Sequence, residues 1–266
     1  MLINVVEAIQ AQCPEVKIFG SELMLAMERK DINWKWFYHT AIKADPAASS
    51  NLDILAVHGY SDGKAASTGS EFAKMWTTHT DQFAKPMKKK VWMSETSGYF
   101  ETWEAVGAKP GALNLAMDMY AGLKYGNISA WVLWQGSQSS LIGEFNLMNN
   151  TTATKRYCIS KHYFRYIRPG AIWTEATSSD AEVFATAYQN SAKGTHTIVL
   201  VNSGEARSVS VERLNLPATF KMYRTTSESD NCSPISDIQT GAANSFLSPS
   251  FLSSPEELSF PAQARL

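Results

Sequence analysis

The sequence predicts an α/β protein in which parallel strand–helix units precede a region of short antiparallel strands. Before residue 170, apolar runs alternate four times with segments whose apolar residues recur at helical spacing. The runs are apolar along almost their whole length, which is typical of parallel strands covered by helices. Each unit takes roughly 35 to 40 residues, and a closed (β/α)8 barrel needs about 250 residues for eight units. Half of a barrel therefore fits before residue 173.

From about Trp173 the pattern changes. Short segments of alternating polarity are separated by turn residues such as those at 189–190 and 202–204. This pattern is typical of an antiparallel sandwich. We therefore predict an α/β chain with half of a (β/α)8 TIM barrel at residues 1–172 and a C-terminal antiparallel β-sandwich domain at residues 173–266.

The elements of the first region follow from local signals. Four strands are predicted at residues 16–20, 52–57, 91–95 and 128–134. Apolar residues at helical spacing predict helices at residues 2–12, 33–43, 71–85, 114–125 and 155–166. Pro14, Pro86 and Gly126 stand where three of these helices should end, because proline cannot continue a helix and glycine favours its C-terminal cap.

Composition excludes several classes of protein. The chain has 266 residues, of which 44% are hydrophobic and 18% charged, and its net charge is −1. These values are ordinary for a globular protein, and the largest basic run is only three lysines at 88–90. We therefore expect no nucleic-acid partner and no membrane partner. The first residues lack the pattern of a signal peptide, which leaves a cytoplasmic protein or one that has lost a leader, so localisation stays open.

Cysteine and histidine spacing gives no sign of a metal site. The three cysteines, Cys13, Cys158 and Cys232, are far apart and form no CxxC pair, which argues against a disulfide framework and a structural zinc. The five histidines show no spacing typical of metal ligands. We expect neither a metal nor another cofactor.

The strand at 91–95 ends in a carboxylate, Glu95. In a parallel α/β barrel the carboxyl ends of the strands carry the catalytic groups, so Glu95 is a candidate catalytic residue. An acid at this position is also compatible with an ordinary loop residue or a helix cap, and strand position alone leaves both interpretations open.

Several short stretches together resemble a known family. They are KIFGSE at 17–22, LAVHGY at 55–60, VWMSE at 91–95, AWVLWQ at 130–135, FRYIRPG at 164–170 and YRTTS at 223–227. In this order and spacing they resemble the retaining glycoside hydrolases of the large (β/α)8-barrel clan, and most closely family 30, which pairs the barrel with a β-sandwich. The resemblance covers nearly the whole chain and implies that the chain is the C-terminal half of such an enzyme.

The resemblance assigns roles to individual residues. It implies that the four strands are barrel strands five to eight, and that Glu95 is the nucleophile at the end of strand seven. His58 and Tyr60 match sugar-binding positions after strand six. Trp134, with Gln135 beside it, matches the aromatic platform after strand eight.

One family motif is missing. The acid/base glutamate of the family lies in an Asn-Glu-Pro motif, and this sequence contains none. Retaining hydrolysis needs two carboxyl groups about 5 to 5.5 Å apart. Glu22, just after the strand at 16–20, is the nearest substitute acid/base, and Glu144 is a weaker one. Glu22 is also compatible with a purely structural loop residue.

Three functions remain open at this stage. The first is a retaining β-glycosidase fragment that acts through Glu95 when oligomerised, and the second is a catalytically silent carbohydrate-binding remnant. The third is a scaffold whose open strands drive assembly. In all three we expect a homo-oligomer, because a half barrel leaves unpaired strand edges. The carbohydrate itself is not determined, because sugar specificity depends on loop shape.

Overall fold

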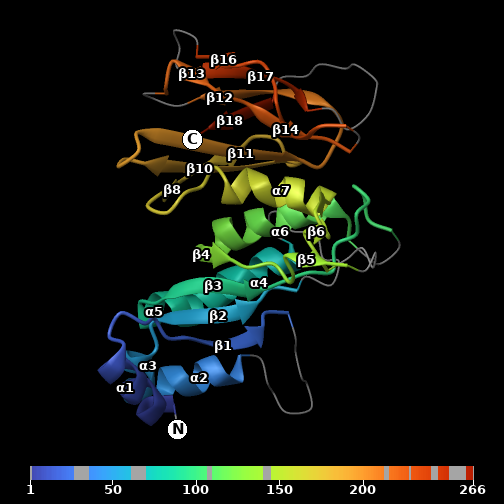
Figure 1. The fold of residues 1–266 in the computed structure, drawn as a ribbon. Helices are drawn as coiled ribbons and strands as arrows, with labels where there is room; N and C mark the ends of the chain where they lie inside the picture. Colours follow the sequence, from blue (N-terminus) through green and yellow to red (C-terminus); the bar gives the residue numbers. More distant parts are fainter. Residues whose placement is uncertain are drawn as a thin grey trace. The chain divides into compact units, whose positions relative to one another are not determined.

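The computed structural model describes residues 2–26, 36–60, 70–106, 110–139, 145–212, 216–227, 229–240, 245–251 and 262–265 (Figure 1). The chain forms two compact units. The first comprises Met1–Gly98 with Ala121–Gly136, and the second comprises Tyr99–Tyr120 with Ser137–Leu266. The predicted domain boundary at 172/173 stays a prediction.

The first unit contains a four-stranded parallel sheet. Its strands are β1 (Phe19–Met24), β2 (Ile54–His58), β3 (Lys90–Glu95) and β4 (Ile128–Trp131), in that spatial order. Strands that follow one another along the chain are neighbours in the sheet, as in a barrel wall (Figure 1). The mixed α/β architecture is therefore confirmed, and the parallel sheet fits a partial barrel.

Helices connect the parallel strands. Before β1 lies α1 (Leu2–Gln12), and between β1 and β2 lie α2 (Phe37–Ala44) and α3 (Pro46–Asn51). Between β2 and β3 follow α4 (Glu71–His79), the π-helical turn η2 (Thr80–Ala84) and α5 (Lys85–Met87). The long helix α6 (Ala112–Tyr125) connects β3 to β4.

Helix starts have local causes. The Ser70 hydroxyl accepts a hydrogen bond from the Ala73 amide at 3.1 Å, which caps α4. Asp45 caps α3 in the same way, and Pro46 at the first helical position supplies a suitable φ.

The core of the first unit follows the apolar runs. Leu55, Ala56 and Val57 of β2 are fully buried, as are Trp76 of α4 and Met93 of β3. Burial of consecutive residues in β2 explains why this run is continuously apolar rather than alternating.

Two of the four strands differ from the prediction by three or more residues at an end. The first strand begins at Phe19 and extends to Met24, where Leu23 and Met24 pair with Val57 and His58 of β2. Before the strand, the Asp53 carboxylate accepts a hydrogen bond from the Ile18 amide at 2.8 Å and pairs with Lys17. The fourth strand ends at Trp131 rather than at residue 134. The amides of Val132 and Trp134 nevertheless donate to Met93 and Thr96 at 2.8 and 2.7 Å, which keeps this segment beside β3.

The second unit contains α7 (Lys155–Phe164) and short strands. One sheet is formed by β11 (Thr195–Asn202), β10 (Val183–Asn190) and β8 (Ile172–Thr174), all antiparallel. Another has the order β17 (Ser245–Phe251), β12 (Arg207–Glu212), β18 (Ala262–Arg265) and β9 (Thr177–Ser178), in which β12 and β18 are parallel. Short strands are found as predicted, and most of the pairs in these two sheets are antiparallel. The parallel pair of β12 and β18 differs from the predicted antiparallel arrangement, and packing as a sandwich stays a prediction.

Smaller pairings complete this unit. They are β13 (Thr219–Phe220) with β16 (Ile238–Gln239), β14 (Tyr223–Thr225) with β15 (Asn231–Pro234), and the small sheet of β5 (Ser137–Gln138), β6 (Met148–Asn149) and β7 (Thr152–Ala153).

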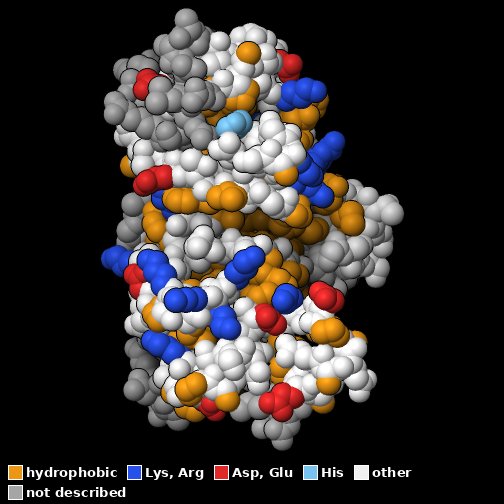
Figure 2. All heavy atoms as spheres, turned by 90° about the vertical axis from the view of Figure 1, so that its left-hand side faces the viewer, with side chains coloured by type: hydrophobic (Ala, Val, Ile, Leu, Met, Phe, Trp, Pro, Cys, Tyr) orange, Lys and Arg blue, Asp and Glu red, His pale blue; other side chains and the backbone are white. Residues whose placement is uncertain are grey.

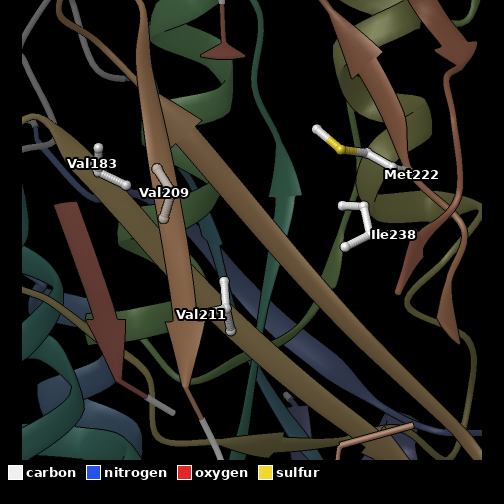
Figure 3. Close-up of a cluster of buried hydrophobic side chains, with 5 residues drawn as sticks. All are labelled: Val183, Val209, Val211, Met222 and Ile238. Carbon is white, nitrogen blue, oxygen red and sulfur yellow. The ribbon is translucent and has the colours of Figure 1, made fainter. Parts of the chain in front are cut away.

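A cluster of buried side chains in the second unit consists of Val183, Val209, Val211, Met222 and Ile238. In Figure 3 Met222 and Ile238 lie together, set apart from the three valines. Partly buried residues, including Ile198 and Leu200 of β11, pack against this cluster.

The surface is mixed in charge. On the face that Figure 2 shows, several Lys and Arg side chains lie near one another, with Asp and Glu side chains among them. Lys88, just after α5, and Lys90, the first residue of β3, are exposed, as expected for a solvated basic run. Within the described residues, none of the helices is long and apolar enough for a membrane span.

Candidate active site

The candidate site lies at the carboxyl edge of the parallel sheet in the first unit. Glu95 is the last residue of β3 and His58 the last residue of β2, and the two are register partners. The Gly59 amide donates to the Glu95 carbonyl at 2.9 Å, and the Thr96 hydroxyl donates to the Gly59 carbonyl at 3.2 Å. These bonds fix both strand ends, so the side chains of Glu95 and His58 project from a rigid edge.

Tyr60 contacts Glu95 directly. Its hydroxyl donates a short hydrogen bond to Oε1 of Glu95, whose side chain is 28% exposed. Partial burial, together with this hydrogen bond, raises the pKa of Tyr60 to about 12. Tyr60 therefore remains protonated at neutral pH and acts as a permanent donor to the carboxylate.

His58 stands between two carboxylates. Its Nε2 atom lies 3.7 Å from Oε2 of Glu95 and 3.9 Å from Oε1 of Glu22. Because both oxygens are within 3.9 Å of one nitrogen, they are less than about 8 Å apart. The fold thus brings Glu22, His58, Tyr60 and Glu95 together from three neighbouring strands.

Glu22 reaches this group from inside β1, not from the loop after a strand as the sequence predicts. The pairing of β1 with β2 shifts between Ser21 and Leu23, so that Glu22 is the extra residue of a β-bulge, with φ of 60°. A bulge re-aims the side chain that it carries. The Glu22 side chain is 47% exposed and accessible to solvent.

Trp134 and Gln135 follow β4. The Trp134 amide donates to the Thr96 carbonyl, one residue beyond Glu95, and Trp134 is 52% exposed. Gln135 is half-buried. An exposed indole held by its backbone beside the end of β3 can serve as a flat contact surface for a ligand. Glu144 lies outside the described residues.

Sequence reasoning missed a buried histidine pair beneath β1. Nδ1 of His39 lies 3.1 Å from Nε2 of His79, and Nε2 of His39 lies 3.3 Å from the Ser21 amide, next to the bulge of Glu22. Burial lowers the pKa of His39 to about 4. The pKa of His79 is lowered to about 3, mainly by burial and to a smaller extent by electrostatic repulsion from His39. Both rings are uncharged at neutral pH. The only sequence signal is that each histidine stands on the apolar face of its helix.

The arrangement is that of a carboxylate site without a metal cluster. Among the residues that the structure describes, no group of three or more His, Cys, Asp or Glu is placed to hold a metal ion. The chemistry that these four side chains offer is that of a hydrogen-bonded carboxylate with a second carboxylate and an imidazole nearby.

Comparison with known proteins identifies similar chains. No family model matches the chain. Residues of this chain are 27% identical over 166 positions to the glucuronoxylanase XynC of Bacillus subtilis (strain 168), a match that covers 59% of this chain and 33% of that protein. The chain thus matches about a third of the length of this curated relative.

Solved structures give the same result for the fold. The catalytic domain of the GH30 xylanase C from Talaromyces cellulolyticus superposes with a TM-score of 0.65 at 18% identity, over 95% of this chain and 53% of that one. A glucosidase from Croceicoccus marinus superposes with a TM-score of 0.52 at 11% identity, over 93% of this chain and 60% of that one. Together with the curated relative, these structures confirm the resemblance to family 30 glycoside hydrolases, of which the chain corresponds to a part.

Proposed function

We propose that the chain is part of a retaining β-glycosidase that hydrolyses β-glycosidic bonds with Glu95 as the nucleophile. The observation that carries the proposal is the position of Glu95 at the carboxyl end of a central parallel strand, with Tyr60 bound to one oxygen and His58 near the other. A positioned carboxylate that is partly open to solvent can attack an anomeric carbon.

The reaction has two steps. Glu95 attacks the anomeric carbon and forms a glycosyl ester as the glycosidic bond breaks, and the leaving oxygen takes a proton from an acid. Water then attacks the same carbon, gives its proton to the conjugate base of that acid and releases Glu95. Tyr60 orients the free carboxylate before the first step, because its hydroxyl donates to Glu95 and stays protonated at neutral pH.

Glu22 is our candidate for the acid. The nearest described carboxylate oxygens of Glu22 and Glu95 are less than about 8 Å apart. This upper bound is compatible with the 5 to 5.5 Å between the carboxyl groups of retaining enzymes, and with part of the range of inverting enzymes. His58, within 4 Å of both carboxylates, is placed to hydrogen-bond a sugar hydroxyl. With an activated aryl leaving group, which needs little protonation, Glu95 alone should support a slow reaction.

The substrate proposed first is a β-linked xylan. Two of the similar proteins are named as xylanases, and an exposed Trp134 ring fits the flat face of a sugar. Gln135 would hydrogen-bond the same sugar. Trp134→Ala should raise the KM, or the dissociation constant for xylo-oligosaccharides, about tenfold, with little loss of stability because half of the ring is exposed.

We also propose a half barrel of strands five to eight, a sandwich domain at 173–266, and activity that depends on a homo-oligomer. In the described sheet β1 pairs only with β2, and β4 only with β3. Such edges, with Phe19 and Val132 about half exposed, favour association. A purely monomeric species by light scattering at micromolar concentration would contradict this part of the proposal.

A catalytically silent carbohydrate-binding remnant is the alternative. It is favoured by the absence of an Asn-Glu-Pro motif from the sequence, since the family's acid/base glutamate lies there. Such a remnant would keep sugar affinity in Glu95→Gln and hydrolyse nothing.

The decisive experiment measures aryl β-xyloside and xylan hydrolysis in each size-exclusion fraction. Glu95→Gln should lower the rate by at least about a thousandfold, whereas Glu15→Gln, an exposed isosteric control, should leave it unchanged. Azide added to Glu95→Gly should yield the glycosyl azide of inverted configuration, because azide then attacks in place of the nucleophile.

Glu22 is tested separately. Glu22→Gln should slow substrates with poor leaving groups more than activated aryl glycosides, since only the former need protonation. Equal effects on both would remove Glu22 from the acid role. If Glu95→Gln still hydrolyses the substrates, Glu95 is not the nucleophile. If no wild-type fraction is active but the protein still binds sugar, the result favours the catalytically silent remnant.

A further inference from the structure

The second unit contains a cavity that the proposed hydrolysis does not use. Its volume is about 580 Å3, and it is formed by α7, β11 and the segments around β13 and β14. This volume lies within the usual range for small-molecule sites. None of the candidate active-site residues lines it.

Part of the cavity lining is an apolar group. Ile159 of α7, Val199 and Leu200 of β11, and Met222 and Ile238 from the opposite segments all line it. Met222 and Ile238 are the pair set apart from the valines of the same cluster in Figure 3. Leu200 faces this cluster yet is only partly buried, so an apolar ligand would remove further apolar surface from water.

Aromatic rings make up much of the wall. They are Trp103, Tyr163, Tyr166, Phe220 and Tyr223. The rings of Tyr166 and Tyr223 stack with centroids 4.7 Å apart and planes inclined by 29°. Flat walls of this kind favour a flat, aromatic ligand over a branched aliphatic one.

The charged residues of the lining all have the same sign. They are Arg165, Arg168, Lys193, Lys221 and Arg224, and among the residues that the structure describes no Asp or Glu lines the cavity. Arg224 is neutralised by Asp230, whose Oδ2 lies 2.6 Å from the guanidinium Nε. Within the described part of the chain the other four make no ion pair, and all four are exposed. A chain of net charge −1 thus carries a local excess of positive charge at the rim of an apolar cavity.

We propose that this cavity binds a small aromatic carboxylic acid of one or two rings. The ring enters the apolar, aromatic interior, and the carboxylate stays at the rim near Lys193 and Lys221. An uncharged aromatic compound would leave the rim cations without a partner, and a simple inorganic anion would not use the interior. Both properties of the cavity are matched only by a ligand that combines an aromatic ring with an anionic group.

The test is calorimetric titration of the full chain with 2-naphthoate, its neutral analogue 2-naphthalenemethanol and the cation 2-naphthylmethylamine. We expect 2-naphthoate to bind about tenfold more tightly than the alcohol, because two exposed ion pairs should each increase the affinity about threefold. The amine should bind most weakly of the three. Lys193→Glu/Lys221→Glu should abolish or reverse this preference. Lys74→Glu/Lys90→Glu, which changes two exposed lysines that do not line the cavity, should retain it.

A second variant tests the interior. Ile198→Trp places a large ring in the lining and should weaken binding of the acid and the alcohol alike by at least about tenfold. Circular dichroism tests whether each variant is folded. If Ile198→Trp does not fold, the two lysine double variants alone test the proposal. The proposal is overturned if 2-naphthoate does not bind at up to about 1 mM, if acid and alcohol bind equally, or if both lysine pairs have the same effect.

Discussion

Acidification should destabilise the first unit through His39 and His79. The folded unit keeps both rings uncharged down to about pH 4, since burial lowers their pKa values to about 4 and 3. In the unfolded chain a histidine takes up its proton at about pH 6.5. The unfolded state therefore binds more protons between about pH 6.5 and pH 4, and the free energy of unfolding falls as the pH drops through this window.

The magnitude follows from the unfolded chain. Each histidine that stays unprotonated in the folded state should lower the free energy of unfolding by about 2 kcal/mol between about pH 7.5 and about pH 5. This follows because pH 5 lies about 1.5 units below the unfolded pKa of about 6.5. The pair therefore costs about 4 kcal/mol. His79→Leu should halve this cost, since one titrating ring remains.

Hydrogen exchange of the β2 amides measures this loss of stability. The exchange is followed by mass spectrometry and corrected for the pH dependence of chemical exchange. Protection should fall about a thousandfold from about pH 7.5 to about pH 5 in the wild type, and about thirtyfold in His79→Leu. Phe72→Leu, a buried control on the same helix, should lower protection at both pH values without changing the thousandfold ratio. Equal ratios in His79→Leu and the wild type would refute the reasoning.

Three further substitutions test other contacts. Tyr60→Phe removes the hydrogen bond to Glu95 and should lower kcat/KM about ten- to a hundredfold without changing the melting temperature, and an unchanged rate would contradict its positioning role. Gly126→Ala would drive a methyl group into the ring of Trp76, which is fully buried, and should cost about 1–3 kcal/mol in urea denaturation. Arg156→Met leaves two buried carbonyls without their donor and should cost about 2–4 kcal/mol, so a loss below about 0.5 kcal/mol would disprove that account.

The sequence predicted the strands of the first unit well because their cause is local. The residues of β2 are apolar in succession since both faces of the strand are buried. In β3, Val91 and Met93 are buried on one face, and Trp92 between them is half-buried. Glu95 and His58 could be placed at strand ends because the apolar runs stop there. Glu22 was misplaced because a bulge has no signature in a run of six residues.

Strand ends and apolar periods are properties of neighbouring residues, so the sequence by itself determined the order of the elements, the parallel sheet and the position of Glu95. Only the tertiary structure decided which side chains meet. Tyr60 and Glu95 are 35 residues apart, and His39 and His79 are 40 apart. Their contacts depend on strand register and helix packing, which bring distant residues together and leave no periodic pattern in the chain.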